Sequence, residues 1–237
     1  VVKSRIIIFI AAILLLIPSV LGYLHTRVNY DILSYLPENI ETMKGQDILV
    51  DEFGTGAFST FVVDGMSNKE ISALKAKIED VDHVKTVLWY DSVADISIPT
   101  DMLPEKMQKV FLSDEGTLMF IMYDTTMSAD ETMEAVEQIR AISNEQCFLS
   151  GMSAVVTDIR DLSDKEVPVY VLLAVILSLV VLSLTMDSFL IPIFFLLSIG
   201  MAIIYNLGTN VFMGEISYVT KALSAVLQLG VTMDYSI

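Results

Sequence analysis

Asp234 and Tyr235 combine two groups that can exchange protons, and they end an apolar stretch that begins near Tyr218. Lys221 is the charged residue that precedes them there, 13 positions earlier, which is about 20 Å along a helix. If Lys221 marks one edge of a bilayer, Asp234 lies beyond the midplane of a hydrocarbon core about 30 Å thick. An ionised Asp at the centre of a span costs about 2.5–3.5 kcal/mol and is tolerated where it faces a bundle interior or a water-filled path. We therefore interpret Asp234 as a proton-accepting carboxyl, with the Tyr235 hydroxyl as a donor and acceptor beside it.

Gly230 precedes Asp234 by one helical turn and shares a face with Leu223 and Leu227. A glycine in a membrane helix lets another backbone approach closely, so we expect Gly230 to mark helix packing near the relay. An alternative stays open. If the helix begins at Ile216, Asp234 moves toward the cytoplasmic edge of the membrane and becomes an ordinary interfacial acid.

The sequence contains little that could support other chemistry. Cys147 is the single cysteine, which excludes an intrachain disulfide and a cysteine-based zinc site. His25 and His83 lack the spacing of metal ligands, no phosphate-binding Gly-rich loop with Lys occurs, and no serine has a nucleophile setting. We therefore expect no enzyme activity, no metal and no cofactor, and any energy that the protein uses must come from elsewhere.

Four apolar segments could cross a membrane, since a span needs about 20 apolar residues. They are Ile6–Leu24, Val167–Met186, Phe189–Leu207 and Tyr218–Ile237. The first could instead be a signal peptide ending at Pro18, but its apolar stretch continues to Leu24 without a good cleavage site. Lys3 and Arg5 precede it, and the positive-inside rule then keeps the N-terminus in the cytoplasm and places the region after Leu24 outside.

Residues 25–166 carry 27 acidic and 11 basic residues, which accounts for the whole formal net charge of −16. Such a region faces water and cannot neutralise phosphates, so we expect no nucleic-acid partner. We divide the chain into a first transmembrane helix (1–24), an external α+β domain (25–166) and transmembrane helices two to four (167–237), the fourth interrupted by the end of the sequence.

The external region predicts two strand–helix–strand units after a connector with short elements at 25–57. The first unit is a strand at 58–63, a helix after a Ser67–Glu70 capping box, and a strand at 84–89. The second is a strand at 117–123, a helix capped by Ser128 with Glu131 three positions on, and a strand at 147–149. A short helix follows Pro104, and a helix at 153–165 leads into the second span. This order is that of a ferredoxin-like, split βαβ domain beside an α-helical multi-pass membrane bundle.

These features together resemble the MMPL branch of the resistance-nodulation-division (RND) transporters. The similarity lies in Gly230-Val-Thr-Met-Asp234-Tyr235-Ser-Ile, in Asp31–Pro37 after the first span, and in Asn206–Asn210 after the third. The resemblance implies a proton-driven exporter of lipids or other amphiphilic molecules in the cell membrane. It also implies that Asp234 and Tyr235 are the proton-relay pair, and that a C-terminal half with a second such pair is missing from this sequence.

Two other functions remain open. One is a membrane receptor of the same superfamily, of the sterol-sensing kind, or an accessory of protein secretion. The other is an anchored binding module whose spans only hold the external domain. A second external domain and a second Asp-Tyr pair in the parent protein favour export.

Overall fold

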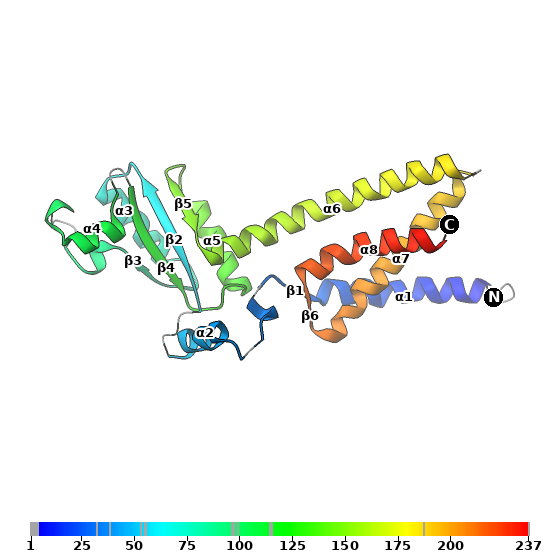
Figure 1. Cartoon of the computed structure of the whole chain (residues 1–237), viewed down its shortest axis with the longest axis horizontal. Coiled ribbons are helices and arrows are strands. Elements are labelled where there is room, and N and C mark those ends of the chain that lie inside the picture. Colours follow the sequence, from blue (N-terminus) through cyan, green and yellow to red (C-terminus); the bar gives the residue numbers. More distant parts are fainter. Residues whose placement is uncertain are drawn as a thin grey trace. The chain divides into compact units, whose positions relative to one another are not determined.

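The computed structural model describes residues 5–31, 33–37, 39–52, 54, 56–95, 98, 100–113, 116–186 and 188–236, and of residues 5, 34, 100 and 232–236 it describes the backbone alone. The chain forms two compact units (Figure 1). One is Asp31–Ile159, and the other combines Val1–Tyr30 with Arg160–Ile237. The α/β unit is thus a few residues shorter at both ends than the predicted domain of residues 25–166, since Tyr30 and the segment before it pack within the helical unit.

A four-stranded antiparallel sheet forms the centre of the α/β unit. Its strands follow the order β3-β4-β2-β5. They are β2 (Ala57–Asp64), β3 (Val84–Leu88), β4 (Gly116–Tyr123) and β5 (Cys147–Ser150). The helices of the unit are α2 (Glu41–Asp51), α3 (Asn68–Glu79), α4 (Glu105–Phe111) and α5 (Asp130–Ile142), with short 3₁₀ helices η2 (Leu33–Tyr35), η3 (Tyr90–Ser92) and η4 (Thr100–Met102).

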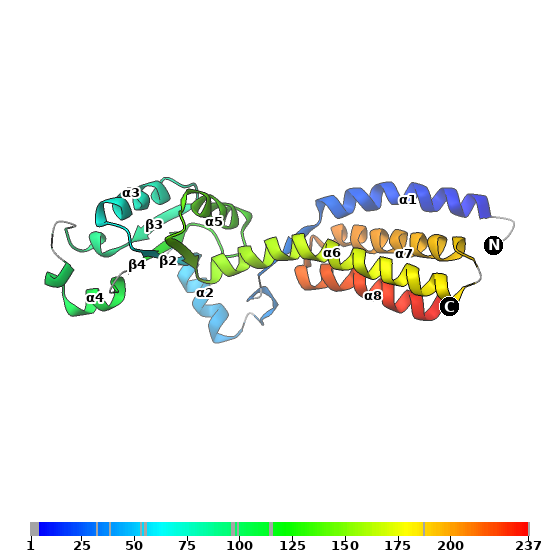
Figure 2. The ribbon, with the colours of Figure 1, turned by 90° about the horizontal axis from the view of Figure 1, so that it is seen from above.

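The core lies between the sheet and helices α3 and α5, which Figure 2 shows on one side of the strands. Alternate residues of β2 and β4, including Phe61, Met119 and Ile121, are fully buried against them because successive side chains in a strand point to opposite faces. Apolar residues that recur at helical spacing in α3 and α5 are also buried, most of them in the same core. These are Ile71, Leu74 and Ile78 of α3, and Met133, Val136 and Ile139 of α5.

The two predicted helix caps have different outcomes. Ser67 is confirmed, since its hydroxyl accepts a hydrogen bond from the Glu70 N–H and the Glu70 carboxylate accepts one from the Ser67 N–H at 3.0 Å. The same contacts from the Ser67 side chain and backbone lower the pKa of Glu70. The Ser128 cap is wrong. Helix α5 has Ala129 at its N-cap, and the Ser128 hydroxyl instead donates to Asp31 at 3.4 Å.

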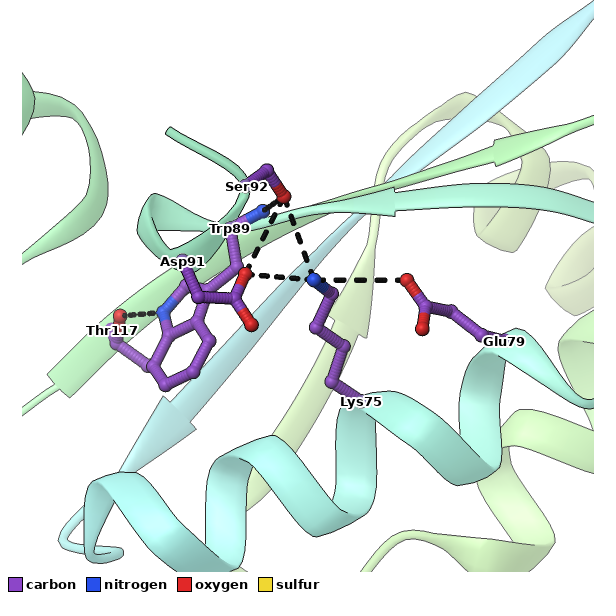
Figure 3. Close-up of polar contacts among 6 residues, drawn as sticks. All are labelled: Lys75, Glu79, Trp89, Asp91, Ser92 and Thr117. Carbon is purple, nitrogen blue, oxygen red and sulfur yellow. Dashed lines mark hydrogen bonds and ion pairs between the residues drawn. The ribbon is translucent and has the colours of Figure 1, made fainter. Parts of the chain in front are cut away.

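A network of polar contacts fastens the end of β3 to helix α3 and strand β4 (Figure 3). The indole Nε1 of Trp89 donates to the Thr117 hydroxyl at 2.8 Å, and that hydroxyl donates to the Phe111 carbonyl at 2.7 Å. Lys75 of α3 lies 2.7 Å from the Asp91 carboxylate. Because Trp89 is completely buried, the contact to Thr117 satisfies a donor that has no access to water.

Thr117→Val should lower the free energy of unfolding of the α/β unit by about 1–3 kcal/mol, because it leaves the Trp89 N–H buried without an acceptor. Trp89 is the only tryptophan of the chain, so its fluorescence during urea unfolding measures the effect directly. Thr60→Val on the open sheet face is the matched control. Equal urea midpoints for the two variants would show that the network does not stabilise the unit.

Helix α2 and the strand pair β1–β6 were not predicted. Helix α2 forms where we expected only a connector with short elements, and none of its residues is buried. Strands β1 (Arg27–Asn29) and β6 (Glu215–Ser217) pair in parallel within the helical unit. A pairing between segments almost 190 residues apart, three residues each, leaves no pattern in the sequence.

The helical unit contains α1 (Arg5–His25), α7 (Leu190–Thr209), η5 (Asn210–Met213) and α8 (Tyr218–Ser236), together with α6 (Met152–Thr185) from Arg160 on. Helices α1, α6 and α7 are long and apolar enough to cross a membrane, so the chain is a membrane protein. Helix α6 continues directly from the predicted helix at 153–165 into the second span. In α8 the apolar part among the residues described in full is shorter, Tyr218–Val231.

Candidate functional site

Helix α8 carries the predicted relay residues. It begins after β6, where the Ser217 hydroxyl accepts a hydrogen bond from the Val219 N–H at 3.2 Å. Its backbone continues to Ser236 and therefore includes Gly230, Asp234 and Tyr235 in its last two turns. The side chains of Asp234 and Tyr235 lie outside the described residues, so their position follows from the helical backbone alone.

An ion pair marks the level at which α8 begins its membrane segment. The Lys221 ammonium lies 3.1 Å from the Asp164 carboxylate of α6. Asp164 stands three residues before Val167, where the uncharged part of α6 starts. Both helices therefore enter their apolar segments at one level, and Asp234 lies 13 residues, or about 20 Å, further along α8.

Tyr30 completes this cluster of charged and polar groups. Its ring stacks on Tyr218 with centroids 5.7 Å apart, and its hydroxyl donates to Asp164 at 3.4 Å. Burial and the neighbouring Asp164 carboxylate raise the pKa of Tyr30 to about 12, so the hydroxyl keeps its proton at physiological pH. Sequence reasoning used Lys221 as a marker but did not identify Asp164 and Tyr30 as its neighbours.

An apolar cavity of about 410 Å³ lies beside the ion pair, within the helical unit. Lys221, Asp164 and Ser163 supply its polar groups, and the remaining lining is mostly apolar. That apolar lining comes from α1, α6, α7 and α8: Tyr23, Val167, Pro168, Val171, Ile203, Leu207, Ala222 and Ala225. A charged end and apolar walls are the features that suit an amphiphilic molecule.

The face of α8 that leads toward Asp234 is uncovered in the described part of the chain. Leu223, Leu227 and Val231 are each about half exposed. At Gly230, no described atom beyond the neighbouring residues and the helix's own backbone lies within 4 Å of where a Cβ would stand. The expected close approach of a second helix at Gly230 is therefore still a prediction, and it needs a partner from outside this part of the chain.

A close helix contact does exist elsewhere, where α1 crosses α7. A Cβ on Gly22 would overlap the backbone of Gly208, and a Cβ on Gly208 would overlap the backbone of Ser19. The Tyr205 hydroxyl donates to the Ala12 carbonyl of α1 in the same contact. Gly208 belongs to the Asn206–Asn210 segment. The close contact with α1 therefore explains why this segment has a glycine at position 208.

The contents of the site limit its chemistry. Among the residues that the structure describes, no group of three or more His, Cys, Asp and Glu is arranged to hold a metal ion. Asp187, which lies between the second and third apolar segments, is outside the described residues. The uptake and release of a proton by Asp234, beside Tyr235, remains a prediction from the sequence.

The model of the MMPL family matches residues 35–237, from η2 to the end of α8. None of the curated proteins matches the chain.

Proposed function

The chain belongs to the MMPL family, whose membership indicates an RND-type membrane transporter, and we propose that it acts in the proton-driven export of lipids or other amphiphilic molecules. Asp234 would bind and release the proton, and Tyr235 would exchange it with its surroundings. The observation that carries this proposal is the place of Asp234 in α8, about 20 Å beyond the Lys221–Asp164 level. Placing a carboxyl at that depth costs free energy, so such residues are rare in membrane helices and usually mark a functional site.

We infer that the α/β unit is the external, porter-like domain. Its strand order β3-β4-β2-β5 and its two strand–helix–strand units support a ferredoxin-like, split βαβ fold. Lys3 and Arg5 before α1 favour a cytoplasmic N-terminus in the cell membrane, which puts residues 25–166 on the extracytoplasmic side.

The charge of Asp234 supplies the force for the conformational change. An ionised carboxylate needs polar or aqueous surroundings, whereas the neutral acid tolerates apolar packing, so protonation favours a different packing of α8. The Lys221–Asp164 pair joins α8 to α6, and α6 continues without a break from Thr185 back to Met152. A shift of α8 could thus be passed along α6 toward the external domain.

The uncovered α8 face also has a place in this proposal. We assign it to a second repeat, of which the family resemblance implies a second Asp-Tyr pair facing the first. Gly230, which leaves open space on this face, would let that partner helix approach closely.

Everted membrane vesicles containing the full-length protein test the proposed function. Export out of the cytoplasm becomes accumulation inside such vesicles, so a fluorescent phospholipid analogue should accumulate when the lumen is acidic and stop when a protonophore collapses the gradient. Vesicles without the protein provide the baseline. Accumulation that continues unchanged after the gradient is collapsed would exclude proton coupling, and protein-independent accumulation would exclude export.

A further inference from the structure

A groove in the α/β unit lies between helix α2 and the face of the sheet opposite the core. Its volume is about 580 Å³, within the range of small-molecule sites. Residues from α2, from strands β2, β3 and β4, and from the segments before α5 and at the start of α6 line it. They are Gln46, Leu49, Gly56, Ala57, Phe58, Lys85, Met122, Met127 and Met152.

Most of this lining is apolar and adaptable. Phe58 is 48% exposed and Leu49 is 47% exposed, so apolar surface faces the groove without a covering group in the described chain. Three methionines contribute flexible, polarizable side chains, which can adjust to ligands of different shape. Such a surface fits an aliphatic chain better than a rigid polar ligand.

The polar groups of the groove are basic or neutral. Lys85 is its charged residue, and none of the described acidic residues lines it, although residues 25–166 contain 27 acids and 11 bases. The register of β3 against β4 shifts between Val84 and Thr86, so Lys85 sits at a β-bulge, a feature often found beside functional sites. Its ammonium donates to the Gly54 carbonyl at 2.9 Å, and its side chain is exposed.

Helix α2 forms an adjustable wall of the groove. None of its residues is buried, and the Gln46 side chain ties it to the Gly56 carbonyl at 3.0 Å. An element with so little buried surface can shift at low cost. The α2 side of the groove can therefore move around a chain, whereas Ala57 and Met127, which belong to the core, form a fixed part of the lining.

We propose that this groove binds the aliphatic chain of an amphiphile whose anionic head, a carboxylate or a phosphate, is held by Lys85. The inference rests on the proposed function, because the ligand would be cargo of the exporter or a molecule that resembles it. The positive charge of Lys85 determines the expected class of ligand, because it attracts an anionic head group and repels a cationic one.

A photoreactive palmitate with a diazirine in its chain tests the site on the full chain in phosphatidylcholine nanodiscs. After illumination, mass spectrometry should locate the label on peptides that contain Leu49, Met122 or Met127. Met122→Trp should reduce this labelling at least about fivefold by filling the groove, and Lys85→Gln should reduce it similarly, whereas Lys85→Arg should retain it. Phe148→Trp, on the same sheet face but outside the groove, is the matched control and should label normally.

Head-group charge is tested by competition. Dodecyl phosphate should displace the photoreactive palmitate, as should unlabelled palmitate, and dodecyltrimethylammonium should not. Labelling spread evenly over the apolar sheet face, labelling unaffected by Met122→Trp and Lys85→Gln, or equal competition by the cationic amphiphile would overturn the site. Circular dichroism melting of each variant distinguishes loss of the ligand from loss of the fold, including any effect of losing the Lys85–Gly54 hydrogen bond in Lys85→Gln.

The two proposals can fail separately. If the label is absent from the groove while export still depends on the proton gradient, only the groove assignment is lost. If the groove binds palmitate while export ignores the gradient, the proposed function is lost and the site survives.

Discussion

Asp234→Asn in the full-length protein should reduce proton-driven export about 100-fold or more. Asparagine fills the same volume as aspartate, but its amide cannot bind and release a proton at physiological pH. The helix itself should be unaffected, since Asn replaces Asp without adding bulk or removing a backbone hydrogen bond. Accumulation of a fluorescent phospholipid analogue in everted vesicles, normalised to the amount of protein in the membrane, measures the effect.

Two further variants make this result specific. Asp234→Glu keeps a titratable carboxyl and should retain part of the export, whereas Asp101→Asn removes an exposed acid of η4 and should change nothing. Export by Asp234→Asn at the level of the unmodified protein would remove the proton relay from the account. A loss shared by Asp101→Asn would point to a general effect of charge on the acidic domain.

Gly208→Leu should prevent the correct packing of α1 against α7. A Cβ at this position already overlaps the Ser19 backbone, and a larger side chain cannot be accommodated by rotating a flexible neighbour. Overpacking of this kind costs about 1–3 kcal/mol, and more where backbone must move. We expect a thermal unfolding transition lowered by many degrees, or failure to accumulate in the membrane, as measured by fluorescence-detected gel filtration after heating.

Gly200→Leu is the matched control for this variant. It lies on the same helix, but no described atom stands within 4 Å of where its Cβ would be apart from adjacent residues and the helix's own backbone. The two substitutions therefore add the same side chain to α7 and differ in the neighbour that the side chain meets. Equal behaviour of the two variants would show that the Gly22–Gly208 contact does not determine the packing of these helices.

The regular elements of the α/β unit could be predicted because their residues carry the signal locally. The β-branched, aromatic and other apolar residues at 58–63 and 117–123 indicate strands, and the repeat of Ile71, Leu74 and Ile78 indicates one buried helix face, which the structure shows. Helix α2 has no buried residue, and its segment was interpreted only as a connector with short elements. Ser128 has the residue type of a cap but bonds to Asp31, a partner 97 positions away, which no local pattern could indicate.

The site shows the same division between local and distant information. Asp234 is visible in the sequence because a charged residue interrupts an apolar segment, and Gly230 because it stands one turn earlier. The pairing of Lys221 with Asp164 joins residues 57 positions apart, and the Gly22–Gly208 contact joins two helices that are even more distant in sequence. Small residues and interfacial charges are common in membrane helices, so their partners become identifiable only when the helices are placed side by side.

The depth of residue 234 in the bilayer tests the central claim most directly. A nitroxide attached to Asp234→Cys in the full-length protein, reconstituted in lipid, can be compared with one attached to Lys221→Cys by their collisions with oxygen and with a water-soluble nickel chelate. We predict that the label at 234 meets oxygen far more than nickel, because it lies about 20 Å along the helix from residue 221 and about 10 Å inside the opposite edge of the hydrocarbon core. A label at 234 that collides freely with nickel at the level of the lipid head groups would contradict the account.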